Sequence, residues 1–430
     1  MTTYPQVLFK NRRPGETVLL PEYEKSGGYQ GLRDALKMEP SQVCDVIKAS
    51  ALRGRGGAGF PTGIKWSFFP ADAPGEKYLV CNGDEMEPGT YKDRQLLLAD
   101  PHQLVEGMAI AAYAMQTPVG YIFLRYAYED CSQRVERAIE EALAAGYLGR
   151  NIFGSGFDVE LHVHRSAGRY ILGEETALLN GLEGRRPNPR SKPPFPAQSG
   201  LFGKPTNVNN VETLANVPHI LANGIMWFHD LALNPESAGT KLFGLSGHLN
   251  RPECFELPLG ITLREVVEEV GGGVRGGKKF KACLPGGAST PYLTAEHLDL
   301  MMDFNPLEEV QSRLGTAGVT VFDEDTCMVA VTRNLNQFFA RESCGWCTPC
   351  RDGLATVSWL LDRIEFGQAT IDDLAMLKDQ VRNIRGRSFC ALAEGAMGPV
   401  EALLRLFEDE IIDHIKQGKC PFRRSLGSGG

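Results

Sequence analysis

The amino-acid sequence predicts an α/β fold: a layered domain with a mostly parallel sheet, then a smaller β-rich domain and a C-terminal helical bundle. Three observations support this prediction. In the first half of the chain, strand-like apolar runs alternate with segments of helical periodicity. From about residue 231 the runs become short and mixed, which indicates a small β-rich unit. After about residue 324 the pattern is helical and stays so.

The chain opens with helical segments and continues with strands between helices. Helices are predicted at 28–36 and 41–52, with Ser41 as the N-cap of the second. Strand-like runs follow at 77–82, 120–125 and 158–164, with helices between them at 101–116 and 129–146. Strands spaced by helices are typical of a parallel sheet. Residues 185–206 are rich in Pro, Arg and Lys and are predicted to form a long surface loop.

The remaining elements divide the second half of the chain in two. The β-rich unit has strand-like runs at 241–247, 254–260 and 281–287 and a helix at 262–270. The bundle has predicted helices at 328–341, 353–366, 371–385 and 393–415. We therefore expect four parts, namely an N-terminal helical segment with a glycine-rich loop (1–62), the α/β domain (63–230), the β-rich domain (231–323) and the bundle (324–430).

Charge and cysteine content exclude several classes of protein. With 430 residues, a net charge of −8 and no run rich in Lys and Arg, the chain is not expected to bind nucleic acid. No apolar run approaches the length of a membrane span, and the N-terminus is too polar for a signal peptide. Eleven cysteines, an odd number, predict a reducing compartment and no disulfide framework.

Four of the cysteines have the spacing of an iron–sulfur ligand set. Cys344, Cys347 and Cys350 form a Cys-x-x-Cys-x-x-Cys run, and Cys390 is the best candidate for the fourth ligand of a [4Fe–4S] cluster. Zinc is the alternative metal, although structural zinc usually pairs two separate Cys-x-x-Cys knuckles. The chain is therefore predicted to move electrons one at a time. The other cysteines are expected to pack as small apolar residues; they are Cys44, Cys81, Cys131, Cys254, Cys283, Cys327 and Cys420.

A glycine-dense segment at 53–63 contains a Gly-x-Gly-x-x-Gly pattern. A helical stretch precedes the segment and Pro61 follows the pattern, which is the wrong context for a dinucleotide fingerprint. Exposed backbone N–H groups beside the cations of Arg55 and Lys65 still suit a bound phosphate. A flexible surface turn is the alternative.

An acidic segment follows the first predicted strand. Asn82 ends that strand, and three carboxylates come next: Asp84, Glu85 and Glu87. The carboxyl end of a parallel strand is where α/β folds bind ligands, so these groups are candidate acceptors for flavin or ribose donors. A solvated acidic turn is the alternative.

Two further polar segments have both a functional and a structural interpretation. Glu174 and Glu175 lie where a loop opens a helix at Gly173, and the helix dipole alone would stabilise acids there. The segment 207–213 offers several side-chain amides that suit a polar heterocycle, or that cap a helix.

In this order, the segments resemble the NADH-binding flavoprotein subunits (the F-subunit type) of bacterial respiratory complex I, the NADH:quinone oxidoreductase. The resemblance covers roughly residues 25–405. It rests on Arg53-Gly-Arg-Gly-Gly-Ala-Gly-Phe60, Cys81-Asn-Gly-Asp-Glu-Met-Glu-Pro-Gly89, Gly173-Glu-Glu-Thr-Ala-Leu178, Arg190-Ser-Lys-Pro-Pro-Phe195, Gly203-Lys-Pro-Thr-Asn-Val-Asn-Asn-Val-Glu-Thr213 and Glu342-Ser-Cys-Gly-Trp-Cys-Thr-Pro-Cys350.

The resemblance implies a Rossmann-like flavin-binding domain, a ubiquitin-like β-grasp domain of the soluble-ligand-binding type and a helical bundle that holds one [4Fe–4S] cluster. It implies FMN as the flavin. The residues implied to bind FMN are Gly54, Arg55, Gly56, Lys65, Asn82, Asp84, Glu85, Tyr170, Gly173, Glu174, Asn209, Asn210 and Thr213. Those implied to bind NADH are Phe60, Phe68, Glu175, Lys192 and Phe195. Glu87 is implied to face the contact between flavin and nicotinamide.

The implied function is NADH oxidation with electron transfer through FMN and the cluster toward quinone. The implied partners are a thioredoxin-like [2Fe–2S] subunit and the large iron–sulfur subunit, in a peripheral arm on the cytoplasmic side of the inner membrane. The diaphorase component of an NAD-linked hydrogenase or formate dehydrogenase is the alternative.

The sequence departs from the family pattern at a few positions close to the implied site. Gly83 stands where Ala is usual, and Tyr126, Ala127 and Tyr128 replace Gly-Glu-Tyr. Ser166 stands in place of Gly and Leu172 in place of Cys. These departures bear on the shape of the flavin site and on the flavin potential.

Overall fold

The first half of the chain forms a four-stranded sheet in the computed structural model, which describes residues 4–422. The strands are β1 (Tyr78–Gly83), β2 (Val119–Leu124), β3 (Glu160–Arg165) and β4 (Thr206–Asn210). Their order is β3-β2-β1-β4, and every neighbouring pair is parallel. The first three confirm predicted strands. The fourth occupies a segment expected to be loop and helix start, because Val208 is its one apolar residue.

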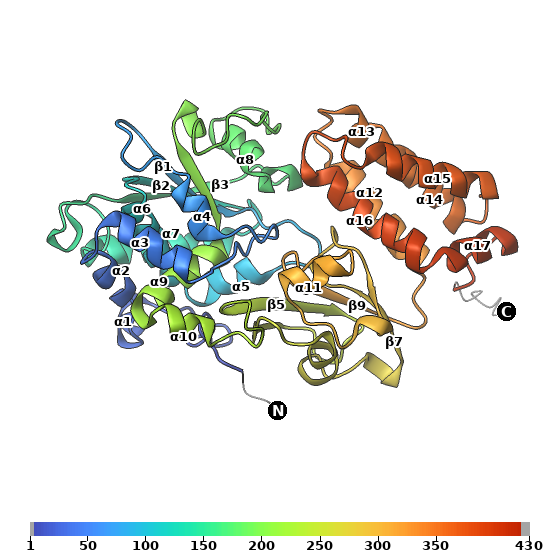
Figure 1. Cartoon of the computed structure of the whole chain (residues 1–430), viewed down its shortest axis with the longest axis horizontal. Helices are drawn as coiled ribbons and strands as arrows, with labels where there is room; N and C mark the ends of the chain where they lie inside the picture. Colours follow the sequence, from blue (N-terminus) through green and yellow to red (C-terminus); the bar gives the residue numbers. More distant parts are fainter. Residues whose placement is uncertain (1–3, 423–430) are drawn as a thin grey trace.

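Helices surround this sheet (Figure 1). The N-terminal helices are α1 (Leu20–Lys25), α2 (Gln30–Ala35), α3 (Pro40–Ala49) and α4 (Thr62–Ser67), and those of the layered domain are α5 (Lys92–Ala99), α6 (His102–Ala114), α7 (Glu129–Ala144), α8 (Glu175–Leu182), α9 (Val211–Asn223) and α10 (Ile225–His229). The prediction of Ser41 as the cap is wrong, because Pro40 takes the first helical position and Glu39 is the N-cap. The Glu39 side chain accepts from the backbone N–H of Gln42, the third helical residue. Helices α6 and α9 touch at Gly107, where an added Cβ would lie 2.1 Å from the Leu214 carbonyl oxygen.

The second unit is a five-stranded mixed sheet. Its strands are β5 (Thr240–Gly247), β6 (Cys254–Pro258), β7 (Phe280–Leu284), β8 (Leu293–Thr294) and β9 (Gly318–Asp323). They lie in the order β6-β5-β9-β7-β8, with β5 and β9 parallel and the other pairs antiparallel. A helical turn (Glu265–Val270) and α11 (Phe304–Glu309) pack on it. The prediction of a small β-rich unit is confirmed, although the sequence pattern does not predict β8 and β9.

The third unit is a helical bundle beside the other two (Figure 1). Its helices are α12 (Met328–Glu342), α13 (Thr348–Arg351), α14 (Gly353–Glu365), α15 (Ile371–Ile384), α16 (Ala391–Leu406) and α17 (Glu408–Gln417). The sequence predicts a single helix at 393–415. The structure instead breaks it at Phe407, whose φ of −137° is not helical, so that α17 packs back on α12 and α14.

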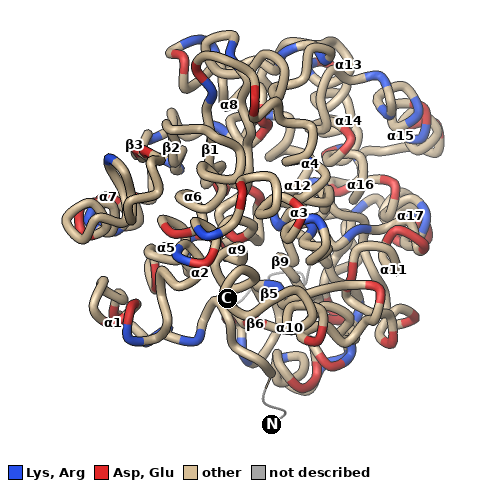
Figure 2. The backbone as a smooth tube through the Cα atoms, turned by 60° about the vertical axis from the view of Figure 1, so that its left-hand side comes forward, with Lys and Arg blue, Asp and Glu red and all other residues tan. Residues whose placement is uncertain are grey.

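Figure 2 shows acidic and basic residues interspersed over the backbone in all three units. Within residues 4–422, no helix combines the length and apolar character needed to cross a membrane.

Candidate functional site

The predicted site residues gather at the carboxyl ends of β1 and β4. Asn82 and Asn210 are paired in register, and the Asn210 side-chain amide donates to the Asn82 carbonyl oxygen at 3.3 Å. The Asn82 amide in turn donates to the Gly173 carbonyl oxygen at 2.9 Å. The end of the sheet, which is where α/β folds bind ligands, is thereby joined to the loop before α8.

The glycine-rich loop lies against the end of β4. The Arg55 backbone N–H donates to Thr213 Oγ1 at 2.8 Å, and a Cβ added at Gly56 would lie 3.1 Å from Asn210 Cβ. The Arg55 guanidinium is fully buried and donates from Nη2 to the Ala238 carbonyl oxygen at 3.1 Å. Its Nε and Nη1 have no partner among the described residues. The loop is therefore anchored by Arg55 to both the start of α9 and the segment before β5.

Asp84 is buried directly after β1. Its Oδ1 accepts from Ser166 Oγ at 2.6 Å, while its Oδ2 has no partner among the described residues. Burial raises the pKa of Asp84 to about 6, and the Ser166 hydrogen bond and Arg125 partly oppose that rise. Asp84 is thus a carboxyl group with one oxygen available to a ligand.

Glu85 is engaged by the protein itself. Its carboxylate accepts from the backbone N–H groups of Asp93 at 2.9 Å and Arg94 at 3.1 Å, in the first turn of α5. The hydroxyl of Tyr128, in the segment that departs from the family pattern, donates to it at 3.0 Å. Burial, followed by the charge of Asp93, raises the pKa of Glu85 to about 7. A solvated acidic turn is therefore the wrong description of this segment.

Glu87 is held by the layered domain and by the mixed-sheet unit together. Its Oε2 accepts from the Tyr170 hydroxyl and its Oε1 from the Ser289 backbone N–H, each at 2.6 Å. The ring of Tyr170 packs edge-on against Phe338 and Phe339 of α12, with centroid distances of 5.3 and 5.7 Å. Glu87 is thus held by donors from two different units of the chain.

Glu174 and Glu175 open α8, and each has a separate role in the structure. Glu174 is the N-cap and accepts from the backbone N–H groups of Thr176 and Ala177 at 2.9 and 2.8 Å. Glu175 binds Lys65 Nζ at 3.1 Å and Lys192 Nζ at 2.6 Å.

Burial opposes ionisation of Glu175, but Lys65 and Lys192 outweigh it and hold its pKa below the ordinary value. The structure therefore brings Lys65, Glu175 and Lys192 together.

The asparagine side chains of β4 are held in place by hydrogen bonds. Asn209 accepts from Trp66 Nε1 at 3.2 Å and donates to Asn207 Oδ1 at 2.7 Å. Asn210 accepts from the backbone N–H of Glu212 at 3.0 Å and so caps α9. The interpretation of this segment as a helix cap is confirmed for Asn210.

Three predicted nucleotide-binding aromatic residues project into solvent. The exposed fractions are 49% for Phe60, 66% for Phe68 and 55% for Phe195. They come from three segments that each border predicted site residues. Exposed aromatic surface of this size is available for a planar ligand.

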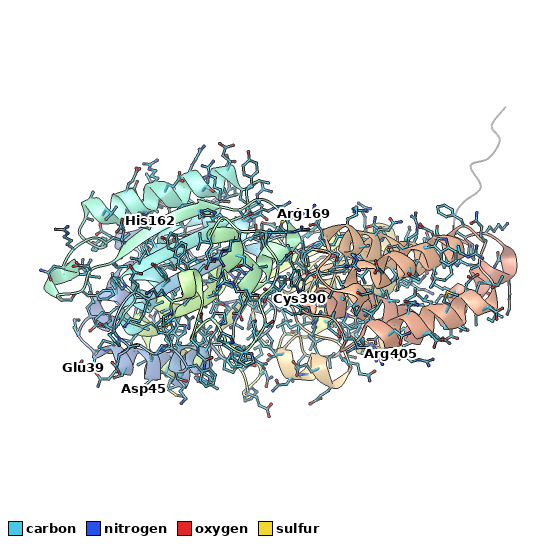
Figure 3. The ribbon with its side chains drawn as sticks, turned by 90° about the horizontal axis from the view of Figure 1, so that it is seen from above. Glu39, Asp45, His162, Arg169, Cys390 and Arg405 are labelled. Carbon is cyan, nitrogen blue, oxygen red and sulfur yellow. The ribbon has the colours of Figure 1, made fainter. Side chains whose placement is uncertain are left out.

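The four predicted iron ligands converge at the inner end of the bundle. Cys347 precedes α13 and Cys390 precedes α16, and the backbone N–H of Phe389 donates to Cys347 Sγ at 3.4 Å. Burial raises the pKa of Cys350 to about 11, to which the neighbouring Cys347 and Cys344 add. Burial likewise raises the pKa of Cys390 to about 12, to which Glu174, Cys350 and Cys344 add. Figure 3 shows Cys390 where the bundle meets the layered domain.

The residues present suit both groups that the sequence implies. Four clustered thiols are the ligand set of a cubane cluster. Partnerless buried polar atoms on Arg55 and Asp84, beside a loop without side chains at Gly54 and Gly56, suit a polar ligand with phosphate. Sequence motifs alone do not point to Trp66 and Ser289, which hold Asn209 and Glu87 in place. The sequence marks Ser166 and the segment of Tyr128 only as departures from the family pattern, and the structure adds that these two residues hold Asp84 and Glu85.

Three protein families match consecutive parts of the chain. The Nuo51 FMN-binding domain matches residues 47–219 and the SLBB domain residues 242–293. The NADH-ubiquinone oxidoreductase-F iron-sulfur binding region matches residues 330–414. The FMN-binding match covers the glycine-rich loop and the end of the parallel sheet, and the iron–sulfur match covers all four clustered cysteines.

Solved structures include similar chains. The NAD⁺-reducing [NiFe]-hydrogenase in its H2-reduced state has a TM-score of 0.80 and 35% identity, covering 90% of this chain and 64% of that chain. Its air-oxidized state has a TM-score of 0.82 and 34% identity, covering 93% and 67%.

Curated relatives are more similar in sequence. The NADH-quinone oxidoreductase F subunits of Salmonella typhimurium and Escherichia coli are each 52% identical over 418 residues, 96% of this chain and 94% of the relative. The F subunit of Mycobacterium tuberculosis is 50% identical over 404 residues, 93% of this chain and 90% of the relative. With this identity along nearly its whole length, and with an FMN-binding domain and a 4Fe-4S binding region in the same order, the chain belongs to the family of NADH-quinone oxidoreductase F subunits.

Proposed function

We propose that this chain is the electron-input subunit of a respiratory complex I: it oxidises NADH at FMN and passes electrons singly to its [4Fe–4S] cluster, toward quinone. Tyr170 links the flavin site to the cluster region. Tyr170 donates its hydroxyl to Glu87 at 2.6 Å and its backbone N–H to Glu342 Oε2 at 3.1 Å. Glu342 lies two residues before Cys344. The acidic segment of the flavin site is therefore next to the cluster cysteines.

The flavin site is proposed to consist of the residues around the ends of β1 and β4. Bound FMN supplies two-electron acceptance from a nicotinamide and one-electron release to a metal cluster. The residues proposed to hold it are Gly54, Arg55, Gly56, Lys65, Asn82, Asp84, Glu85, Tyr170, Gly173, Glu174, Asn209, Asn210 and Thr213. Among them Glu85 and Glu174 are proposed to position the site and not to touch the flavin with their carboxylates, because both carboxylates accept from backbone N–H groups at the start of a helix.

The nucleotide site is proposed to lie beside it, with Glu175 as acceptor for the adenosine ribose hydroxyls. Lys192 orients that carboxylate at 2.6 Å, and the exposed rings of Phe60, Phe68 and Phe195 stack the adenine. Glu87 is the proposed catalytic residue at the contact of flavin and nicotinamide. Its two protein donors hold both of its oxygens, so that the carboxylate is fixed in position to orient the reactants.

The four parts expected from the sequence remain our proposed domains, with boundaries after residues 62, 230 and 323. The partners proposed are a thioredoxin-like [2Fe–2S] subunit and the large iron–sulfur subunit of the complex. The proposed location is the cytoplasmic side of the inner membrane, in the peripheral arm. The diaphorase alternative is less well supported, because identity is 34–35% to the hydrogenase chains and 52% to two of the F subunits.

Replacing one cluster ligand tests the proposal. Cys347→Ser removes a thiolate, so we expect the full-length chain to lose most of its iron and the EPR signal of the reduced cluster. FMN content and reduction of FMN by NADH, followed by stopped-flow absorbance, should persist. Cys44→Ser is the control, because Cys44 is a half-buried thiol of α3 that donates to the Ala114 carbonyl oxygen. Unchanged iron content and an unchanged EPR signal in Cys347→Ser would contradict the assignment.

A further inference from the structure

A second group of potential metal ligands lies at the other end of α12. Cys327 precedes α12, Glu365 ends α14, His414 lies in α17, and Cys420 follows α17 in the C-terminal turn. All four side chains are buried, and one ligand atom from each lies within 4.8 Å of the others. Helix α12 has 15 residues, so this group lies roughly 20 Å from the four cluster cysteines, at 1.5 Å rise per residue.

The distances in this group match the edges of a zinc tetrahedron. Zinc bonds of about 2.0–2.3 Å to N, O and S place tetrahedral ligand atoms about 3.3–3.8 Å apart. Cys327 Sγ lies 3.4 Å from His414 Nε2 and 3.6 Å from Glu365 Oε2. His414 Nε2 lies 3.5 Å from Glu365 Oε2. Three of the six edges are thus within the expected range without any rearrangement.

The surroundings orient the ligands toward a common centre. His414 Nδ1 donates to the Glu410 carbonyl oxygen at 2.6 Å, which leaves Nε2 as the nitrogen that faces Cys327 and Glu365. A second hydrogen bond of this kind is usual for a metal-bound histidine. The backbone N–H of Ala330, in the first turn of α12, donates to Cys327 Sγ at 3.3 Å. A thiolate there is stabilised by the N-terminus of the helix.

We propose that Cys327, Glu365, His414 and Cys420 bind a structural zinc ion. Two soft thiolates, an imidazole and a carboxylate form a four-coordinate set without an open position for water, as structural zinc sites require. Binding releases the protons of both thiols to solvent, and metal bonds replace the hydrogen bonds between Cys327 and the side chains of Glu365 and His414.

The proposed ion fastens the turn after α17 to the rest of the bundle. Figure 1 shows α17 at the outer end of the bundle. Lys281 of β7 binds Glu410 of α17 at 2.5 Å and lies 4.3 Å above the ring of Phe422. Zinc at Cys420 therefore holds the turn after α17 against the bundle, and Lys281 holds the same region against the mixed sheet.

Metal analysis of the full-length chain tests the proposal. The protein, expressed with zinc and purified anaerobically with its iron–sulfur cluster, is analysed by inductively coupled plasma mass spectrometry for zinc and iron. We expect one zinc ion per chain that survives dialysis against a weak chelator. Cys420→Ser and His414→Gln should each lose most of the zinc and keep their iron, and Cys347→Ser should do the opposite. Cys283→Ser is the matched control, because Cys283 is a buried thiol of β7 outside the group.

Further measurements keep the result decisive if a variant folds poorly. Cobalt-loaded wild type should show thiolate-to-metal charge-transfer absorption that Cys420→Ser loses, and strong chelation should increase amide hydrogen exchange in α17 without removing iron. A wild-type chain that contains no zinc and takes none up would overturn the proposal. So would a Cys327–Cys420 disulfide found by mass spectrometry, or zinc loss that is equal in Cys283→Ser and in the ligand variants.

Discussion

The hydroxyl of Tyr170 donates to Glu87 at 2.6 Å, while the backbone N–H of the same residue donates to Glu342 of α12 at 3.1 Å. A single residue of the loop before α8 thus joins the acidic segment after β1 to the helix that leads into the cluster cysteines. Ser289 supplies the second donor to Glu87. The position of Glu87 therefore depends on all three units of the chain.

Tyr170→Phe removes the hydroxyl that donates to Glu87 and keeps the aromatic ring against Phe338. A hydrogen bond to a charged group contributes about 1.5 kcal/mol, so we expect about a tenfold decrease in the rate at which NADH reduces FMN. FMN and iron content should not change. Stopped-flow absorbance measures the rate, with Tyr121→Phe on β2 as the control. A rate equal to that of the control would show that Glu87 needs no support from Tyr170.

Glu175→Gln should alter the choice of coenzyme. The carboxylate is expected to accept from the ribose diol and to repel the additional phosphate of NADPH. Its loss also releases Lys65 and Lys192, which lie 3.1 and 2.6 Å from it, as cations for that phosphate. We expect the ratio of kcat/KM for NADH over NADPH to fall by about tenfold or more. Glu160→Gln on β3 is the control, and a ratio that does not move in Glu175→Gln would disprove the assignment.

Ser166→Ala should raise the pKa of Asp84, because the Ser166 hydroxyl stabilises the ionised carboxylate. Burial already raises this pKa to about 6 from an ordinary value of 3.8. Protonation of Asp84 therefore stabilises the fold fully below about pH 4, and this contribution is lost as the pH rises through 6. Infrared titration of the flavin-free chain should show a carboxylic acid band of Asp84 that disappears near pH 6 in the wild type and at higher pH in Ser166→Ala. This band should be absent in Asp84→Asn at every pH. A lower titration pH in Ser166→Ala would refute this.

Gly83→Ala should destabilise the chain. Gly83 is the last residue of β1, and an added Cβ would lie 2.6 Å from Leu124 Cδ2 and 3.1 Å from Val211 Cγ2. Overpacking of this kind costs about 1–3 kcal/mol. We expect a lower Tm in thermal unfolding of the FMN-loaded chain, and partial recovery in the double variant with Leu124→Val. If Gly83→Ala leaves the Tm unchanged, the neighbouring side chains adjust without cost.

The elements that the sequence predicts well are those with an apolar period. β1, β2 and β3 have apolar runs between helices, and the structure has them where expected. Periodicity does not predict β4, because Thr206–Asn210 is stabilised by amide hydrogen bonds and contains almost no apolar surface. The break at Phe407 is equally hard to predict, because neither glycine nor proline marks it.

At the site, too, some features can be predicted from the sequence and others cannot. Motifs predict the types of residue at the flavin site, yet they do not predict the capping role of Glu85, because its donors Asp93 and Tyr128 come from other segments. The sequence leads us to expect Cys327 and Cys420 as small apolar residues. They lie 93 positions apart in the sequence, so their proximity is a property of the folded bundle alone.

Reduction of the anaerobically purified full-length chain by NADH directly tests electron transfer from the flavin site to the cluster cysteines. We expect added NADH to bleach the flavin absorption and the EPR signal of a reduced [4Fe–4S] cluster to appear in the same sample. Bleaching of the flavin without any cluster signal, in protein shown to contain four irons per chain, would contradict electron transfer from the flavin site to Cys344, Cys347, Cys350 and Cys390.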